Sequence, residues 1–209
     1  MFKAIVMDLG GVYFSDGTNI AFEKMNSVIK VQVPRERLEQ LFHGKQGFLG
    51  GLFYRGKIEP EEFWKKVAQE LKINLSNTRK LREIWYSSYT PNKRMKELVL
   101  KLGKKYKLII FSGNTKERVK YLDEKYEFKQ YFDDFVFSFD VGGTKKESIF
   151  YEALIKTLSK LDVQPEEAIL IDDKEKALET AKSFGFKTIL FKDAGQLEQD
   201  INKLGINVV

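Results

Sequence analysis

The sequence contains no cysteine and only one histidine, His43. Without cysteine, disulfide bonds, thiolate metal sites and cysteine nucleophiles are excluded, and a single histidine excludes multi-histidine metal sites. No apolar run approaches the roughly 20 residues that a membrane-spanning helix needs. The early apolar run at residues 4–7 is too short for the hydrophobic region of a signal peptide. We therefore expect a cytoplasmic protein that does not contact a membrane.

Charge of one sign is also not concentrated anywhere in the chain. The 36 basic and 30 acidic residues give a net charge of +6, and the two signs alternate along most of the sequence. This pattern predicts a solvated, ion-paired surface and no nucleic-acid partner, because a nucleic-acid footprint needs clustered positive charge. The 209 residues suffice for one full domain, or for a core domain with a smaller inserted one. The sequence gives no indication of the oligomeric state.

Five short runs rich in β-branched and aromatic residues recur along the chain. Most of them are separated by stretches with helical periodicity, which predicts βαβ units and a parallel sheet buried on both faces. The fold class is therefore predicted as α/β, with a doubly wound parallel sheet of the Rossmann type. The predicted strands lie in residues 3–9, 106–113, 132–139, 166–173 and 186–191. The predicted core helices lie in residues 92–106, 115–126, 148–161 and 174–185.

The interval between the first and second predicted strands is much longer than one crossover requires. About 75 residues separate them, and their pattern predicts an inserted α-helical cap over the sheet. Its expected helices lie near residues 20–31, 35–42, 60–72 and 76–88, and Phe63 and Trp64 are expected to pack its own small core. The glycine-rich stretch at 43–56 suggests a hinge or mobile loop. We expect a core of residues 1–14 and 90–209 and a cap of residues 15–89.

Polar side chains stand where the predicted strands end. Ligands of an open parallel sheet bind outside the carboxyl ends of its strands, so these residues are expected to meet at one rim. A single aspartate at a strand end is commonly a turn residue, but such positions at several consecutive strand ends are much less easily a coincidence. The residues are Asp8, Ser112 with Asn114, Lys145 with Lys146, and Asp172 with Asp173.

This combination of side chains suits one kind of chemistry. Carboxylates repel one another unless a cation joins them, and an oxygen-only set with few protein ligands favours Mg²⁺, which also takes a substrate phosphate. A lysine and a hydroxyl beside the metal can hold the remaining phosphate oxygens. One carboxylate can then attack phosphorus, since carboxylates serve as phosphoryl acceptors.

Four segments resemble, in order, the motifs of the haloacid dehalogenase-like (HAD) superfamily: "MDLGGV", "FSGN", "GTKKESIFYEAL" and "ILIDDKEKAL". The resemblance covers essentially the whole chain. The insertion after the first motif stands where this family carries a helical cap, and "YRGKIEPEEFWKKVAQEL" resembles the cap of a phosphatase-like subgroup with an Asp-Leu-Gly first motif. The resemblance implies a Mg²⁺-dependent phosphomonoester hydrolase acting on a small phosphorylated metabolite.

The resemblance also implies roles for the first and fourth motifs. Asp8 would be the nucleophile that forms an aspartyl-phosphate. Asp8, the backbone carbonyl of Gly10, and Asp172 or Asp173 would hold Mg²⁺.

The second and third motifs would bind the phosphate. Ser112 and Lys145 would contact its oxygens, and Asn114 would either support the same oxygens or cap the following helix. Lys146 stands where the family often has proline, and the spacing to "FYEAL" favours Lys145 over Lys146 as the lysine that enters the site.

The sequence departs from the family pattern at Gly10, where active phosphatases of this superfamily usually have a second aspartate. That aspartate protonates the leaving oxygen and then activates water. Its loss leaves three outcomes: a slow phosphatase, substitution by another acid such as Asp16, or a phosphate-binding or protein-interaction module without turnover. Asp16 is more simply explained as a turn residue before Gly17.

A further alternative within the superfamily is a metal-independent 2-haloacid dehalogenase, in which the aspartate attacks carbon. Members of that branch resemble one another in lacking the acidic pair of the fourth motif and in carrying tyrosine at the position of Gly10. This sequence has the pair and lacks the tyrosine, so dehalogenation is the minor alternative.

Overall fold

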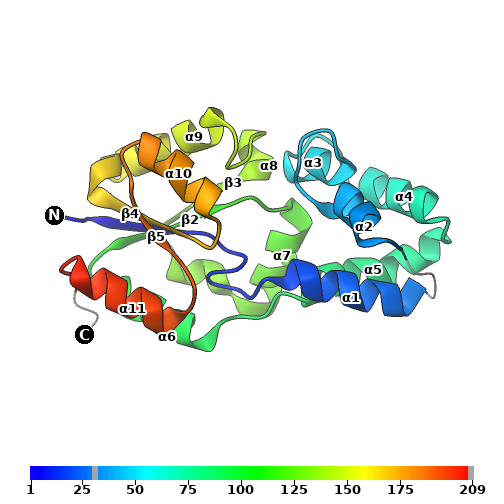
Figure 1. The fold of residues 1–209 in the computed structure, drawn as a ribbon, viewed down its shortest axis with the longest axis horizontal. Coiled ribbons are helices and arrows are strands. Elements are labelled where there is room, and N and C mark those ends of the chain that lie inside the picture. The colour runs from blue at the N-terminus through cyan, green and yellow to red at the C-terminus, as the bar shows by residue number, and fades with distance from the viewer. Residues whose placement is uncertain (30–32, 207–209) are drawn as a thin grey trace.

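The computed structural model of the protein describes residues 1–29 and 33–206, and its centre is a five-stranded parallel sheet (Figure 1). The strand order is β3-β2-β1-β4-β5, so the first strand is the middle one. Each strand falls within a run predicted from the sequence. The strands are β1 (Ala4–Met7), β2 (Lys107–Ser112), β3 (Asp134–Phe137), β4 (Ala168–Asp172) and β5 (Lys187–Leu190).

Helices cover both faces of the sheet (Figure 1). Alternate residues of β1 enter different hydrophobic clusters: Ile5 and Met7 pack with one set of helices, and Ala4 and Val6 with the other. This is what a period of two produces in a strand that is buried on both sides. The first face carries α6 (Lys93–Leu102), α7 (Lys116–Tyr126) and α11 (Ala194–Lys203), and the second carries α9 (Ser148–Lys160) and α10 (Glu175–Ser183). The predicted doubly wound α/β fold is confirmed.

In the core, three short helices and α11 were not predicted from the sequence. The run at 132–139 does not stay extended to its end, because β3 stops at Phe137 and α8 (Ser138–Val141) begins at the next residue. Two single turns, η1 (Phe128–Tyr131) and η2 (Pro165–Glu167), precede β3 and β4. The C-terminal α11 begins behind Asp193, whose carboxylate accepts the N–H groups of Gly195 and Gln196 at 2.8 and 2.9 Å.

The insertion after β1 forms helices that gather at one end of the molecule (Figure 1). They are α1 (Gly17–Ile29), α2 (Arg35–Phe42), α3 (Leu49–Tyr54), α4 (Pro60–Leu71) and α5 (Leu75–Ser87). The predicted helix at 20–31 begins earlier than expected, and its last two positions lie outside the described residues. Proline opens α4 at its first position, where its missing N–H costs nothing.

The expectation of a hinge or loop at 43–56 is wrong for residues 49–54 of that stretch, because α3 (Leu49–Tyr54) lies there. Its two glycines permit a close approach: a Cβ added at Gly50 would lie 2.6 Å from the carbonyl oxygen of His43. These glycines therefore let α3 pack directly on the preceding backbone, and they do not end the helix.

The cap has a hydrophobic cluster of its own, separate from the two clusters of the sheet. Phe63 and Trp64 both lie in it, as predicted, among the aromatic rings of Phe22, Phe42 and Trp85. This separation supports the division into 1–14 with 90–209 and 15–89, which we keep as a proposal.

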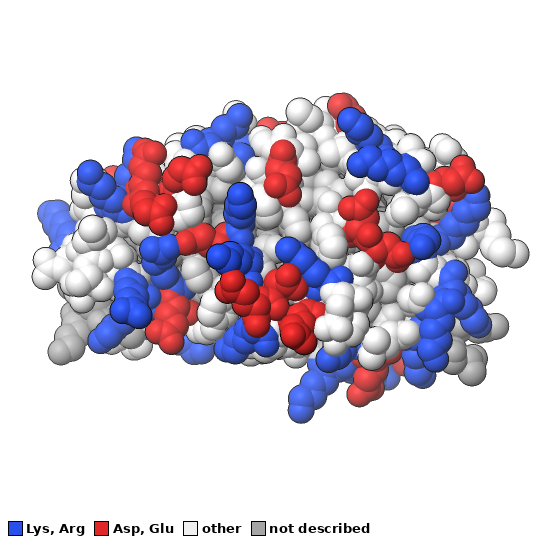
Figure 2. Space-filling view, turned by 180° about the vertical axis from the view of Figure 1, so that it is seen from behind, with Lys and Arg blue, Asp and Glu red and all other residues white. Residues whose placement is uncertain are grey.

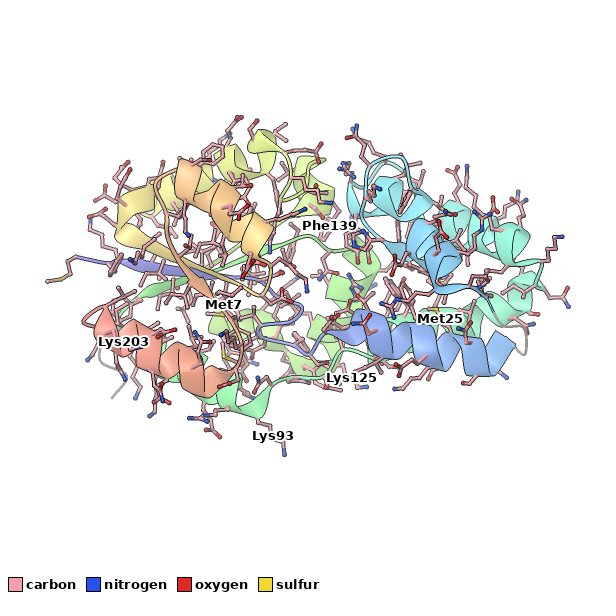
Figure 3. The ribbon with its side chains drawn as sticks, in the orientation of Figure 1. Met7, Met25, Lys93, Lys125, Phe139 and Lys203 are labelled. Carbon is pink, nitrogen blue, oxygen red and sulfur yellow. The ribbon has the colours of Figure 1, made fainter. Side chains whose placement is uncertain are left out.

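The cap and core meet closely beside α8. Gly56 of the cap has a positive φ of 63°, and a Cβ there would lie 2.6 Å from the backbone oxygen of Phe139. Phe139, labelled in Figure 3, stands at this junction. A side chain at position 56 would push the two parts of the molecule away from each other.

The surface carries both charges in alternation. Figure 2 shows Lys and Arg interleaved with Asp and Glu over one face of the molecule. Among residues 1–29 and 33–206, no helix combines the length and apolar character needed to cross a membrane.

Truncating Phe63 tests the cap cluster. Phe63 is 1% exposed and its ring stacks on Phe53 at 4.1 Å between centroids. We expect Phe63→Ala to lower the free energy of unfolding by about 3–5 kcal/mol in urea titrations. Leu52→Ala, at a side chain that is 44% exposed, is the control and should change it by less than about 0.5 kcal/mol. Equal effects of the two variants would contradict this packing.

Candidate active site

Three carboxylates converge at the carboxyl end of the two central strands. Asp8 follows β1 directly, Asp172 ends β4, and Asp173 comes next. The parallel register pairs Met7 with Ile171, and the Asp8 N–H donates to the Ile171 carbonyl at 3.0 Å, so Asp8 and Asp172 are neighbours across the sheet. One oxygen from each carboxylate lies within 4.8 Å of the other two. Such proximity is costly without a shared cation.

Lys145 supplies positive charge at this point. It lies in the loop between α8 and α9, and its Nζ is 2.9 Å from Asp8 Oδ2 and 2.6 Å from Asp172 Oδ2. Burial alone would lower the pKa of the ammonium, but Asp172 and Asp8 raise it above its ordinary value. Lys146 lines the same pocket without sharing these two contacts. The geometry thus favours Lys145 for the role that the spacing predicted.

Asp172 is the most confined of the three carboxylates, with 0% of its surface exposed. Burial raises its pKa to about 6; Lys145 opposes this shift and the charge of Asp8 adds to it. Its Oδ1 accepts the backbone N–H of Lys174 at 2.8 Å. Each oxygen of Asp172 therefore has one partner in the protein, and a carboxylate oxygen can accept a second.

One carboxylate oxygen of Asp173 has no hydrogen-bond partner among the described residues. Its Oδ2 accepts from Lys174 Nζ at 2.5 Å, whereas its buried Oδ1 has no hydrogen-bond partner. Gly11 creates the space for this carboxylate: it has a φ of +84°, and an added Cβ would lie 2.6 Å from Asp173 Oδ2. A buried, unpaired carboxylate oxygen beside two further carboxylates fits a hard divalent cation such as Mg²⁺. Gly10 lines the same pocket.

The second predicted motif reaches the same pocket from β2. Ser112 is the last residue of β2 and lines the pocket together with Asn114. The side-chain oxygen of Asn114 accepts the Thr115 N–H at 2.9 Å and the Arg118 Nε–H at 2.6 Å. That oxygen is engaged at the start of α7, but Thr115 is the N-cap residue and no side chain caps the helix, so the capping alternative is not met in its usual form. A role of Asn114 toward phosphate stays a prediction.

Asp16, the weak candidate for a replacement acid, makes the contacts of a turn residue. Its Oδ1 accepts the Thr18 N–H at 3.2 Å, and its Oδ2 accepts from the Asn19 amide at 3.3 Å. Asp16 is exposed, although it also lines the pocket. These bonds fix the beginning of α1 and agree with the simpler explanation.

Tyr89, which sequence reasoning missed, occupies the space beside Gly10. A Cβ added to Gly10 would lie 3.2 Å from Tyr89 Cε1, so a side chain at position 10 would press on this ring. The Tyr89 hydroxyl accepts from Arg118 Nη1 at 2.8 Å and shares a hydrogen bond of 2.7 Å with Thr18 Oγ1. Burial raises the pKa of Tyr89 well above its usual range. A side chain at position 10, where the family motif usually has aspartate, would therefore contact this ring closely.

A cap residue holds the loop that carries Lys145. Arg55, at the end of α3, donates through Nη2 to Glu147 Oε2 at 2.6 Å, and Glu147 also accepts the Thr144 N–H at 2.9 Å. Burial alone would raise the pKa of Glu147, but these hydrogen bonds lower it. The pocket itself measures about 250 Å³ and is lined by cap residues Phe42 and Tyr54 as well as by the core. The cap thus completes the site and braces its lysine loop.

Comparisons with known proteins place the chain in a family. A family model described as haloacid dehalogenase-like hydrolase matches residues 2–185. An uncharacterized protein of Dictyostelium discoideum is 33% identical over an alignment of 170 residues that covers 74% of this chain and 66% of that protein. The chain therefore spans just under two thirds of the length of that relative.

Two solved structures share the fold over almost their whole length. HAD family enzyme BT-2542 of Bacteroides thetaiotaomicron has a TM-score of 0.77 at 21% identity, with 99% of each chain covered. It has also been solved in complex with magnesium and inorganic phosphate. A HAD-like family hydrolase of Porphyromonas gingivalis has a TM-score of 0.73 at 17% identity, again with 99% of each chain covered.

The family match over most of the chain identifies the class. This chain belongs to the haloacid dehalogenase-like hydrolases. The resemblance inferred from the four motifs is confirmed at this level, and the solved relatives confirm the fold.

Gly11→Ala tests whether the position of Asp173 matters for a metal ion. We expect Mg²⁺ to raise the thermal unfolding midpoint of the wild type, and the added methyl group to displace Asp173 and weaken Mg²⁺ binding by about 10-fold or more. Gly47→Ala is the matched control, because Gly47 has the same φ of +84° and nothing within 4 Å of the added Cβ. If Mg²⁺ shifts the midpoint equally in both variants, the proposed part of Asp173 is wrong.

Proposed function

We propose that the protein is a Mg²⁺-dependent phosphomonoester hydrolase that acts through Asp8 on a small phosphorylated metabolite. One observation carries the proposal: the ammonium of Lys145 lies between Asp8 and the buried Asp172, and Asp173 stands beside them with an unpaired oxygen. The magnesium and inorganic phosphate in a structure of BT-2542 support a site for both on this fold. A pocket of about 250 Å³ suits a small substrate.

In the proposed reaction Asp8 is the group that accepts phosphorus. A carboxylate oxygen of Asp8 forms a bond to phosphorus while the bond from phosphorus to the ester oxygen breaks, and the leaving alcohol takes up a proton. Water then attacks the phosphorus of the phosphorylated Asp8, which releases inorganic phosphate, a proton and the free carboxylate. The Asp8 carboxylate is oriented by the Leu9 N–H, which donates to Oδ1 at 2.7 Å.

The other site residues would bind and orient the phosphoryl group. Lys145 would hold its oxygens once substrate enters, with the hydroxyl of Ser112 as the second donor. Asp8, Asp172, Asp173 and the carbonyl of Gly10 would hold Mg²⁺, which when bound neutralises the carboxylates and the phosphoryl oxygens.

Proton transfer is the weak step of this mechanism. Gly10 offers no acid for the leaving oxygen, and the ring of Tyr89 lies 3.2 Å from where a Cβ at position 10 would stand. A missing proton donor typically lowers a rate by about 10²–10⁴. We therefore propose a slow hydrolase that favours esters with good leaving groups.

The Gly10–Tyr89 arrangement also favours a second candidate, a phosphate-binding or protein-interaction module without turnover. A binding module would explain why position 10 has no acidic side chain. It would not explain why three carboxylates and a lysine remain together at one rim of the sheet. A metal-independent dehalogenase is disfavoured on the same ground, because attack on carbon needs no acidic pair beside the nucleophile.

Turnover of p-nitrophenyl phosphate tests the proposal directly. We expect hydrolysis that requires Mg²⁺, stops with EDTA, and falls by at least about 100-fold in Asp8→Asn. The loss of Mg²⁺-dependent turnover should not be accompanied by unfolding, which circular dichroism checks. A wild type that is no faster than Asp8→Asn would leave the binding module as the function.

Restoring the missing acid tests the account of Gly10. We expect Gly10→Asp to raise kcat/KM for an alkyl phosphate, relative to p-nitrophenyl phosphate, by about 10-fold or more, because only the poor leaving group needs protonation. Gly10→Ala makes the same contact with Tyr89 without adding an acid and is the matched control. If both variants change the ratio equally, the absent carboxylate is not what limits the rate.

A further inference from the structure

Arg118 on α7 is a buried charge for which the structure describes no carboxylate partner. Its side chain is among the largest fully buried ones, with 2% of the residue exposed, and none of the ion pairs within residues 1–29 and 33–206 includes it. Arginine stays protonated in proteins. A buried cation without a counter-ion is costly unless an anion joins it in the working state.

Three neutral oxygens hold the guanidinium in place, each from a different segment. Nε donates to Asn114 Oδ1 at 2.6 Å, Nη1 to the Tyr89 hydroxyl at 2.8 Å, and Nη2 to the Tyr54 hydroxyl at 2.7 Å. A guanidinium carries five N–H donors, so these three bonds leave two donors over. The group is fixed in position but neither neutralised nor saturated.

Aromatic rings surround the same group. The guanidinium carbon lies 4.4 Å from the ring centre of Tyr89, 5.0 Å from that of Trp85 and 5.4 Å from that of Tyr54. Cation–π contacts stabilise a cation without cancelling its charge. They also exclude water, which strengthens any ionic bond that forms there.

Arg118 belongs to the same pocket as the carboxylates. Arg118, Tyr54 and Tyr89 line it together with Asp8 and Lys145. Tyr89 connects the two regions, because its ring lies against Gly10 while its hydroxyl accepts from Arg118. The ring of Tyr89 thus lies between Arg118 and the Gly10 side of the pocket.

We propose that Arg118 binds a carboxylate group of the substrate, so that the substrates are phosphorylated carboxylic acids. This rests on the proposed function, since it assigns the phosphate to the Asp8 end and the carboxylate to the Arg118 end of one pocket. Two spare N–H donors on a rigid planar group match the two oxygens of a carboxylate. The tyrosine and tryptophan rings hold Arg118 ready before the substrate arrives.

Two matched substrates test this inference. Phosphoglycerate and glycerol phosphate differ in a carboxylate against a hydroxymethyl group, and we expect wild-type kcat/KM to favour phosphoglycerate by about 30-fold or more. In Arg118→Gln this preference should fall below about threefold, whereas Arg79→Gln, at an exposed arginine of α5, should keep it. Equal kcat/KM for the two substrates in the wild type would overturn the inference. An equal loss of kcat/KM for both in Arg118→Gln would also overturn it and would leave Arg118 with a structural role only.

A binding measurement keeps the test independent of turnover and of the folding of the variant. In calorimetry on the wild type with Mg²⁺, 4-phosphonobutyrate, whose carboxylate is three methylenes away from phosphorus, should bind about 30-fold or more tightly than butylphosphonate. If no phosphomonoester is hydrolysed in an Asp8-dependent way, the proposed function fails, and the calorimetry still decides the carboxylate site. Equal affinities would overturn the inference even if turnover is found.

Discussion

The site depends on the ion pairs that the ammonium group of Lys145 forms with Asp8 and Asp172. The ammonium group lies between these two carboxylates, and Asp172 is wholly buried. Burial and the charge of Asp8 both raise the pKa of Asp172, and the positive charge of Lys145 opposes this shift. Its position is set by the loop before α9, and Arg55 of the cap holds that loop through Glu147. Charge balance at one point therefore links the sheet, the lysine loop and the cap.

Much of this arrangement was predictable because it follows from local patterns. Strands buried on both faces appear as apolar runs, and the carboxyl ends of parallel strands meet at one rim, so the amino-acid sequence alone suffices to place Asp8, Ser112 and Asp172 together. The helix α3 was not predictable, because its glycines are needed where α3 packs against the backbone of residues 42–45, and this contact exists only in the folded chain. Tyr89 and Arg118 were missed for a related reason: in "TKERVKYL" a buried arginine has the same local appearance as the exposed residues around it.

The departure at Gly10 also changes meaning in the folded protein. In the sequence, Gly10 is only the loss of a carboxylate. In the structure, the ring of Tyr89 lies against Gly10, and the Tyr89 hydroxyl accepts a hydrogen bond from the buried Arg118. We propose that glycine at position 10 removes a proton donor but leaves room for Tyr89, which positions Arg118 to bind a substrate carboxylate. Under this proposal the protein would be a slow enzyme with a selective pocket, and not a site that has lost its function.

The most direct test of the central claim is mass spectrometry of the protein quenched with acid during turnover in the presence of Mg²⁺. The account predicts that one phosphoryl group is found on the peptide containing Asp8, in high yield, because without an acid–base group at position 10 its release is slow. It predicts no such label in Asp8→Asn. Turnover with Asp8 unmodified, or a phosphoryl group found on another residue, would contradict the account.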